Sequence, residues 1–232
     1  MNKENSLASF ANLDVGASFR DRQTVAGQIS DRLREAIRTG VIKEGDELNQ
    51  VGLAEHFGVS RVPIREALRA LEAEGWIKAP TNQRAFVHRF SVDDIAEIFE
   101  LRELIEVDLV GKAVGLIDEA GIAELEELCK GMEAEPNHET WVGRNALFHE
   151  KLVKCSGRNV AIGVVRHLTS QVERYLRPRN ANPDRRTQAN TEHRLIIKAL
   201  REGDRSGVRA LMRAHIRTTR KLVLKNLSQS DR

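Results

Sequence analysis

The chain has 232 residues, of which 41% are hydrophobic and 31% are charged, and its formal net charge is +3. This composition is typical of a soluble globular protein with one large domain or two smaller ones. It excludes a membrane-spanning protein, since no apolar run approaches the roughly 20 residues that a transmembrane helix needs.

The two cysteines, Cys129 and Cys155, lack the CxxC spacing of a redox or zinc motif. Free thiols suit a reducing compartment, so we expect a cytoplasmic protein with no membrane partner. Residues 1–19 have neither the basic start nor the apolar block of a secretory signal. We predict that they form a loosely held, flexible arm.

Charge is distributed unevenly along the chain. Residues 91–150 carry 4 basic and 16 acidic side chains, whereas residues 151–232 carry 20 basic and 6 acidic ones. The simplest interpretation is that the two blocks pair with each other across a folded domain. The alternative is a long basic surface that binds nucleic acid.

Residues 20–90 contain three helical patterns, separated by Gly40, Gly58 and Gly75, and then two short β-like patterns. The last of the three helices has a clear buried face, with Ile64, Ala67, Leu68 and Leu71 at i, i+3, i+4 and i+7. The predicted elements are helices at about 24–39, 50–56 and 61–74, and a β-hairpin made of 76–79 and 85–90.

A short helix, a turn at Gly58 and a second amphipathic helix are the parts of a helix-turn-helix, whose second helix enters the major groove of DNA. Arginine binds guanine in bidentate fashion, serine can hold a phosphate, and valine methyls suit the thymine methyl. The alternative is a core helix with a solvated arginine face. The candidate DNA-binding residues of this helix are Ser60, Arg61, Val62, Arg65 and Arg69.

The run LAEHFGVSRVPIREALRALEAEGWI, residues 53–77, resembles the winged helix-turn-helix of the GntR family of bacterial transcription regulators. The resemblance implies a homodimer that reads a short, palindromic double-stranded DNA operator, with Arg61 and Arg65 as the main contacts. The family's wing usually carries a glycine where this chain has Arg84. Arg84 thereby becomes a further candidate for a phosphate or minor-groove contact.

From Ser91 onward the pattern is helical throughout. Long helices with short connections favour a helical bundle. The predicted helices lie at about 92–116, 119–134, 139–156, 159–177, 184–202 and 205–227. The predicted fold is therefore mainly α, with a winged helix-turn-helix domain at 20–90 and a six-helix antiparallel bundle at 91–232. The family resemblance implies that this bundle serves effector or metal binding and dimerisation.

Three histidines of this region lie on the apolar faces of three different helices. His149 follows Asn145 by one turn, while His193 and His215 precede or follow runs of aliphatic residues. Each alone could be a core histidine. Together they are candidates for a metal site, because bundles build such sites from inward-facing side chains and imidazole suits Zn, Ni, Cu and Fe.

Asn145, His149, His193 and His215 also match the ligand positions of the FCD ligand-binding domain in the FadR-type branch of the same family. The resemblance implies a small organic-acid or sugar-acid effector, bound in some members through a divalent transition metal, with Zn expected and Ni or another ion as alternatives. The neutral amide of Asn145 would leave the ion its full charge and so strengthen its hold on a carboxylate. Alternatively, the histidines hydrogen-bond the acid directly.

Arg102 matches an arginine on the first helix of that domain and could clamp the effector's carboxylate. The alternative is a salt bridge to Glu106 at i+4. The candidate effector-binding residues are therefore Arg102, Asn145, His149, His193 and His215.

The last helix carries a basic stripe at strict i+4 spacing, formed by Arg205, Arg209, Arg213, Arg217 and Lys221. It could touch DNA, but we expect it to pair with the acidic helix at 119–135, within one chain or across a dimer.

These features favour a DNA-binding transcription regulator, by default a repressor, in which a bound carboxylate tightens the bundle and His88–Ser91 transmits the change to the DNA-reading heads. One alternative is a metal sensor in which the ion itself is the signal. A metal-dependent hydrolase is the other, and it requires an inward general base. Glu150 and Glu192 adjoin His149 and His193 but are expected to point about 100° away.

Overall fold

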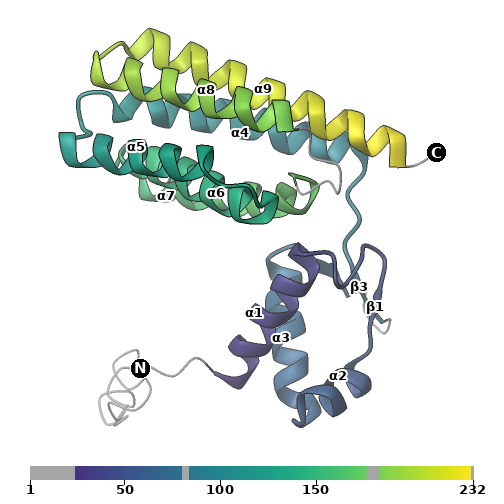
Figure 1. The fold of residues 1–232 in the computed structure, drawn as a ribbon. Coiled ribbons are helices and arrows are strands. Elements are labelled where there is room, and N and C mark those ends of the chain that lie inside the picture. Colours follow the sequence, from purple (N-terminus) through teal and green to yellow (C-terminus); the bar gives the residue numbers. More distant parts are fainter. Residues whose placement is uncertain (1–23, 80–83, 177–182, 231–232) are drawn as a thin grey trace, which may run out of the picture.

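The computed structural model describes residues 24–79, 84–176 and 183–230, so the predicted arm at 1–19 lies outside it. Two bodies with separate hydrophobic cores make up these residues. They are joined by an extended segment that leads out of the small sheet into the first helix of the bundle (Figure 1).

The N-terminal body contains three helices and a small sheet. Its core forms where α1 packs against α3, with Ile29 and Leu33 of α1 against Ile64 and Leu71 of α3. The buried face predicted for the third helix is thereby confirmed. The elements are α1 (Val25–Arg38), β1 (Glu47–Leu48), α2 (Gln50–Phe57), α3 (Arg61–Ala73), β2 (Ile77–Lys78) and β3 (Ala85–Val87).

The turn between α2 and α3 depends on Gly58, whose φ of 65° lies in the left-handed region. A residue without a Cβ adopts this conformation at little cost, and it closes α2 so that α3 can start only three residues later. The helix-turn-helix predicted from the sequence is therefore present.

The sheet has three antiparallel strands in the order β1-β3-β2, whereas the sequence predicted only the hairpin of β2 and β3. The sequence did not indicate the first strand, because two residues are too few to show a period. Leu48 is nevertheless 4% exposed, and its strand pairs with Ala85 and Phe86 of β3. The turn that would join β2 to β3 lies outside the described residues.

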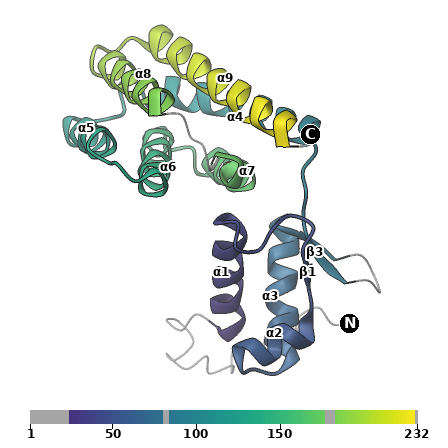
Figure 2. The same cartoon turned by 45° about the vertical axis from the view of Figure 1, so that its right-hand side comes forward.

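The C-terminal body is a bundle whose described part contains six α-helices, as predicted. Seen nearly end on, α4, α8 and α9 form one layer and α5, α6 and α7 the other (Figure 2). The helices are α4 (Val92–Ala113), α5 (Glu119–Glu133), α6 (His138–Lys154), α7 (Asn159–Val172), α8 (Pro183–Arg201) and α9 (Arg205–Ser230). The predicted helix at 159–177 ends earlier, because α7 tightens into the 3-10 helix η2 (Glu173–Leu176).

The acidic and basic blocks pair with each other across the bundle, as expected, but the basic stripe of the last helix has a different partner. Arg217 lies 2.8 Å and Arg213 3.5 Å from Glu103 of α4, and Arg209 lies 3.5 Å from Asp108 of the same helix. The stripe faces α4 because α9 packs along its length. The predicted partner, the acidic helix at 119–135, instead pairs with α8, for example through Glu126 and Arg201 at 2.7 Å.

Within the described part of the chain, no helix combines the length and the apolar character needed to cross a membrane.

Candidate functional site

The exposed face of α3 presents the residues predicted to read DNA. Ser60 is the N-cap of α3, yet its hydroxyl makes no capping hydrogen bond. Val62 is 51% exposed at the first turn. Among the described residues, the side chains of Arg61, Arg65 and Arg69 are exposed and form no hydrogen bond or ion pair. Arg69 therefore does not pair with its helix neighbours Glu66 and Glu72.

Arg84 lies at the start of β3, and its side chain is 72% exposed. Its Nη1 atom lies 2.7 Å from Glu47 Oε2 of β1, so the guanidinium bridges two strands of the sheet. An exposed ion pair of this kind is screened by solvent and adds little stability, so it would not prevent the arginine from moving to a phosphate.

In the bundle, His149 of α6, His193 of α8 and His215 of α9 come together as predicted. One ring nitrogen from each can be chosen so that all three lie within 4.8 Å of one another. His149 Nε2 and His215 Nε2 are 3.1 Å apart. All three side chains are buried, with exposed fractions of 9%, 0% and 5% for His149, His193 and His215.

Burial keeps two of these imidazoles neutral. It holds the pKa of His149 well below its ordinary value, and the charges of His215 and His193 lower that pKa further. Burial, and after it the charge of His215, also holds the pKa of His193 well below its ordinary value. A neutral imidazole has a free lone pair, which is the form that binds a metal ion.

Several polar atoms beside the triad have no hydrogen-bond partner among the described residues. They are His149 Nδ1, both ring nitrogens of His193, and the Asn145 side-chain oxygen. Two imidazole nitrogens bound to one ion at about 2.0–2.1 Å lie roughly 3.0–3.4 Å apart, and the 3.1 Å between His149 and His215 falls in this range. The residues present therefore fit a divalent transition metal.

A cavity of about 310 Å³ opens beside His149 and His215. Its walls come from α4, α6, α7, η2, α8 and α9, and its charged lining is four cations, Arg102, Arg185, Arg186 and Lys225, against one carboxylate, Glu173. Asn145 also lines it, whereas the fully buried His193 does not. The electrostatics of this cavity favour an anion.

Arg102 forms the predicted salt bridge and is also part of the cavity wall. Its Nε atom lies 2.7 Å from Glu106 Oε1, which is the predicted i+4 salt bridge, and the side chain also lines the cavity. The second Glu106 oxygen lies 4.0 Å from His149 Nδ1. Both members of the ion pair are buried, so removal of one would leave the other charge uncompensated.

The expectation that no carboxylate faces the histidines is wrong. Glu192 does point away from His193, but His215 approaches α8 from the same side as Glu192, and His215 Nδ1 lies 2.6 Å from Glu192 Oε2. The spacing contained the signal, since Arg185, Ala189, Glu192 and Ile196 stand at i, i+4, i+7 and i+11. His138, which the sequence analysis did not single out, lines the cavity together with Trp141.

Comparison with known proteins identifies both bodies. The profile described as "Bacterial regulatory proteins, gntR family" matches residues 25–87, and that of the FCD domain matches residues 97–218. The uncharacterised HTH-type transcriptional regulator YdhC of Bacillus subtilis (strain 168) is 31% identical over 199 residues, covering 81% of this chain and 86% of that protein. The gluconate operon transcriptional repressor of the same organism is 25% identical over 199 residues, covering 82% of this chain and 81% of that protein.

Among solved structures, E. coli McbR/YncC has a TM-score of 0.76 and 22% identity, covering 89% of this chain and all of that one (100%). A transcriptional regulator from Rhodococcus sp. RHA1 has a TM-score of 0.73 and 20% identity, covering 88% of this chain and 99% of that one. At these sequence identities, both similarities show a shared fold and nothing further.

A helix-turn-helix body joined to a helical domain defines a DNA-binding transcription regulator. The chain belongs to the GntR family of bacterial transcription regulators, and its C-terminal body carries the FCD domain. The family and the named relatives indicate a regulator and not an enzyme. The hydrolase alternative is excluded on this ground and not by the lack of a nearby carboxylate.

Proposed function

We propose that this protein is a repressor whose operator affinity is controlled by a small organic acid or sugar acid bound in the cavity of the bundle. The observation that carries the proposal is the cationic cavity, whose wall includes His149 and His215 of the histidine triad. A relative named a gluconate operon repressor supports both the sense of regulation and the chemical class of effector.

We assign DNA contact to Ser60, Arg61, Val62 and Arg65, with Arg69 and Arg84 at the edges of the contact surface. The support is that the side chains of the three arginines of α3 are exposed and form no hydrogen bond or ion pair within residues 24–79. Their donors are therefore available to phosphates and bases. The operator would lie on bacterial DNA, and so the protein would act in the cytoplasm. The DNA-binding domain corresponds to residues 20–90 and the effector domain to 91–232.

Asn145, His149, His193 and His215 would hold the divalent transition metal, with Zn first and Ni as an alternative. The ion supplies a fixed positive charge that binds a carboxylate oxygen. The chain's own residues would then orient the acid, with Arg102 beside the triad and Arg185 and Arg186 elsewhere on the wall. A cavity of about 310 Å³ suits a small acid better than a long acyl chain.

The route from cavity to DNA would run through η2. Glu173 lines the cavity and also forms an ion pair with Arg38 of α1 at 2.6 Å. The next residue, Arg174, donates to the His88 carbonyl at 2.6 Å, and Tyr175 bonds to Glu44 and to the Phe90 amide. The same short segment therefore touches the effector's cavity on one side and the DNA-binding body on the other.

The homodimer would form through the exposed side of α4, beside α9. Leu104 is 71% exposed and Leu101 39%. Around Leu104 lie acidic residues of α4 and basic residues of α9, among them Glu100, Glu103, Arg217 and Arg220. An apolar centre with a charged rim is the usual composition of a protein–protein interface, and a two-fold axis would bring the acidic residues of one chain near the basic residues of the other.

DNA recognition is tested with an operator selected by the full-length protein from random duplexes. The Arg65→Ala substitution should weaken binding by roughly 1–3 kcal/mol and relax specificity at one base position, because a base contact is lost. Arg32→Ala, an exposed change on α1, is the matched control. Unchanged affinity and specificity of Arg65→Ala would show that α3 does not read bases.

Effector control is tested by titrating the operator complex with Zn²⁺ alone and then with Zn²⁺ plus lactate, gluconate or citrate. Release by an acid only when Zn²⁺ is present supports the proposal. Release by Zn²⁺ alone supports the metal sensor, whose basis is the triad itself. Tight DNA binding that ignores every acid would overturn effector control while leaving DNA recognition intact.

A further inference from the structure

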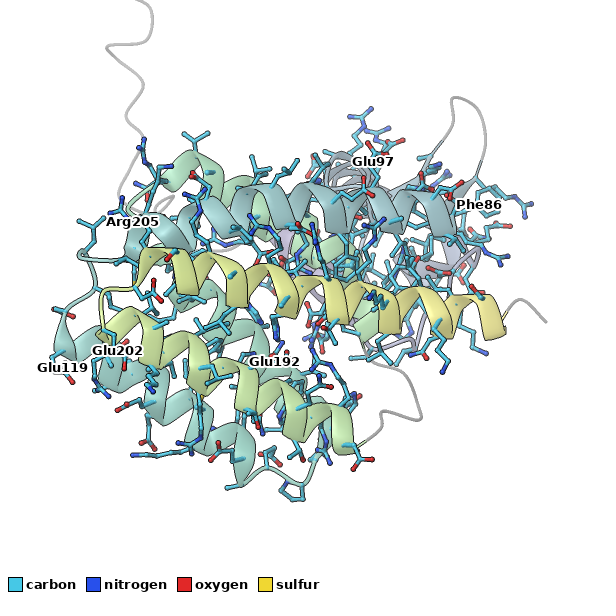
Figure 3. All side chains as sticks on the ribbon, turned by 90° about the horizontal axis from the view of Figure 1, so that it is seen from above. Phe86, Glu97, Glu119, Glu192, Glu202 and Arg205 are labelled. Atoms are coloured by element: carbon cyan, nitrogen blue, oxygen red, sulfur yellow. The ribbon has the colours of Figure 1, made fainter. Side chains whose placement is uncertain are left out.

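We infer that Glu192, clamped by Arg185, is a positioning residue that orients His215 toward the other two histidines. The inference rests on the proposed metal site, which it deepens by naming the pair of residues that prepares one ligand. Glu192 lies at the middle of α8 beside α9 (Figure 3).

The contact with Glu192 places a proton on His215 Nδ1. Glu192 Oε2 lies 2.6 Å from His215 Nδ1, and a carboxylate oxygen at this distance needs a proton on that nitrogen. Glu192 is therefore an acceptor, and His215 Nε2, 3.1 Å from His149, is the nitrogen that can bind an ion.

Arg185 fixes the position of Glu192 from the other side. Its two terminal nitrogens lie 3.0 and 3.1 Å from the two Glu192 oxygens, a bidentate arrangement, and one of them also lies 3.3 Å from Thr219 Oγ1 of α9. A bidentate arginine–carboxylate pair restricts both position and orientation. Glu192 thus cannot rotate away from His215 without breaking two charged hydrogen bonds.

This chain of contacts also reaches the cavity, because Arg185 and Thr219 line it. An acid in the cavity therefore lies next to the group that sets the orientation of a metal ligand. Acid binding and metal binding should be linked through Arg185, in addition to any direct bond between acid and ion.

The test compares three variants of the full-length protein. In Glu192→Gln an amide oxygen can still accept from Nδ1, but the charge is lost. In Glu192→Ala both the acceptor and the charge are lost. In Arg185→Gln the Glu192 carboxylate remains but loses its bidentate contact with Arg185. The matched controls are Arg194→Gln on the same helix and Glu202→Gln just after its end, whose charged partners, Glu133 and Lys198, lie on the surface.

The first measurement is the tautomer of His215 in metal-free protein, read from ¹⁵N-histidine NMR and assigned with His215→Asn. Wild type and Glu192→Gln should have the proton on Nδ1, whereas Glu192→Ala should shift it toward Nε2. An unchanged tautomer in Glu192→Ala would overturn the inference. This arm contains no metal, so it does not depend on whether the proposed metal site is correct.

The second measurement is Zn²⁺ affinity by competition with a chelator. Loss of a group that orients a metal-bound histidine typically weakens binding about 10–100-fold, so Glu192→Ala should reach that range, with Glu192→Gln and Arg185→Gln between it and wild type. Equal affinity of Glu192→Ala and wild type would contradict the positioning role. Failure of wild type to bind Zn²⁺ would instead contradict the proposed metal site. Thermal unfolding of each variant identifies any that fail to fold.

Discussion

At the scale of single residues, the burial of His193 is energetically unfavourable. It is 0% exposed, and neither ring nitrogen has a hydrogen-bond partner among the described residues. A buried polar group without a partner costs about 1–3 kcal/mol. An apolar residue would be more stable here, so the histidine is best explained by a ligand that it binds.

We predict that His193→Leu makes the metal-free protein less sensitive to acid. Burial, and then His215, hold the pKa of His193 below its ordinary value in the folded state. Below about pH 6.5, the ordinary imidazole pKa, the unfolded chain therefore binds a proton that the folded chain does not. The free energy of unfolding then decreases as the pH is lowered, by up to about 1.4 kcal/mol per pH unit for one such group.

The measurement is urea unfolding with a chelator at about pH 7.5 and 5.5, on either side of the imidazole pKa. His193→Leu should lose less stability over this interval than wild type, and it should no longer bind Zn²⁺. His167→Leu, an exposed change on α7, should behave like wild type. The same pH dependence in all three proteins would show that His193 titrates normally.

At the scale of elements, the end of α7 is the connection between the two bodies. The helix approaches the N-terminal body closely enough that a Cβ on Gly75 would lie 3.1 Å from Gln171 Nε2, and Gln171 donates to the Glu74 carbonyl. Arg174, whose side chain is 8% exposed, stacks on the rings of Phe90 and Tyr175. The tightening from α7 into η2 brings these residues and Glu173 to the same junction.

Arg38→Gln is the clean test of this connection, because Arg38 pairs with Glu173 but does not line the cavity. We predict that an effective acid found in the titrations above binds the variant as tightly as it binds wild type, while its effect on operator affinity decreases. Couplings of this kind are typically about 1–3 kcal/mol, or 5–150-fold in affinity.

The measurement is operator affinity with and without saturating acid for Arg38→Gln, Glu173→Gln and the double variant. Arg34→Gln is the control, since Arg34 pairs with Asp31 and Glu74 inside the N-terminal body. If the acid acts on operator affinity equally in wild type and Arg38→Gln, this ion pair does not carry the coupling.

At the scale of the whole molecule, the N-terminal body lies below the bundle in the view of Figure 1. Helix α4 of the bundle has an exposed apolar side. In the proposed homodimer each α3 would read half of a palindromic operator, so operator affinity should depend on dimerisation. We predict that Leu104→Glu gives a monomer that keeps its fold, since Leu104 is 71% exposed in the single chain.

Operator affinity of Leu104→Glu should decrease by about 100-fold or more, because two linked heads bind far more tightly than one. Light scattering gives the mass and gel shift gives the affinity. Leu116→Glu, which is 65% exposed beyond the end of α4, should remain a dimer. A dimeric Leu104→Glu would place the interface elsewhere on the molecule.

Most elements and their chemistry could be predicted from local sequence patterns, with the two-residue β1 as an exception. Periodicity at Ile64, Leu68 and Leu71, together with the turn at Gly58, defined the helix-turn-helix, because local hydrophobic spacing and backbone freedom depend on neighbours in the chain. The inward positions of His149, His193 and His215 followed from helical spacing in the same way. The family resemblance then indicated a regulator, which the comparisons confirmed.

Which helix faces meet could not be predicted from the sequence, because it depends on how the helices pack. The partner of the Arg213 and Arg217 stripe is α4 and not the acidic α5, because α9 packs along α4. Glu192 reaches His215 although it points away from its neighbour His193, because a contact between two helices depends on their packing and not on position within one of them. Spacing along one helix shows which side is buried, and the neighbour that covers it is set by the assembled bundle.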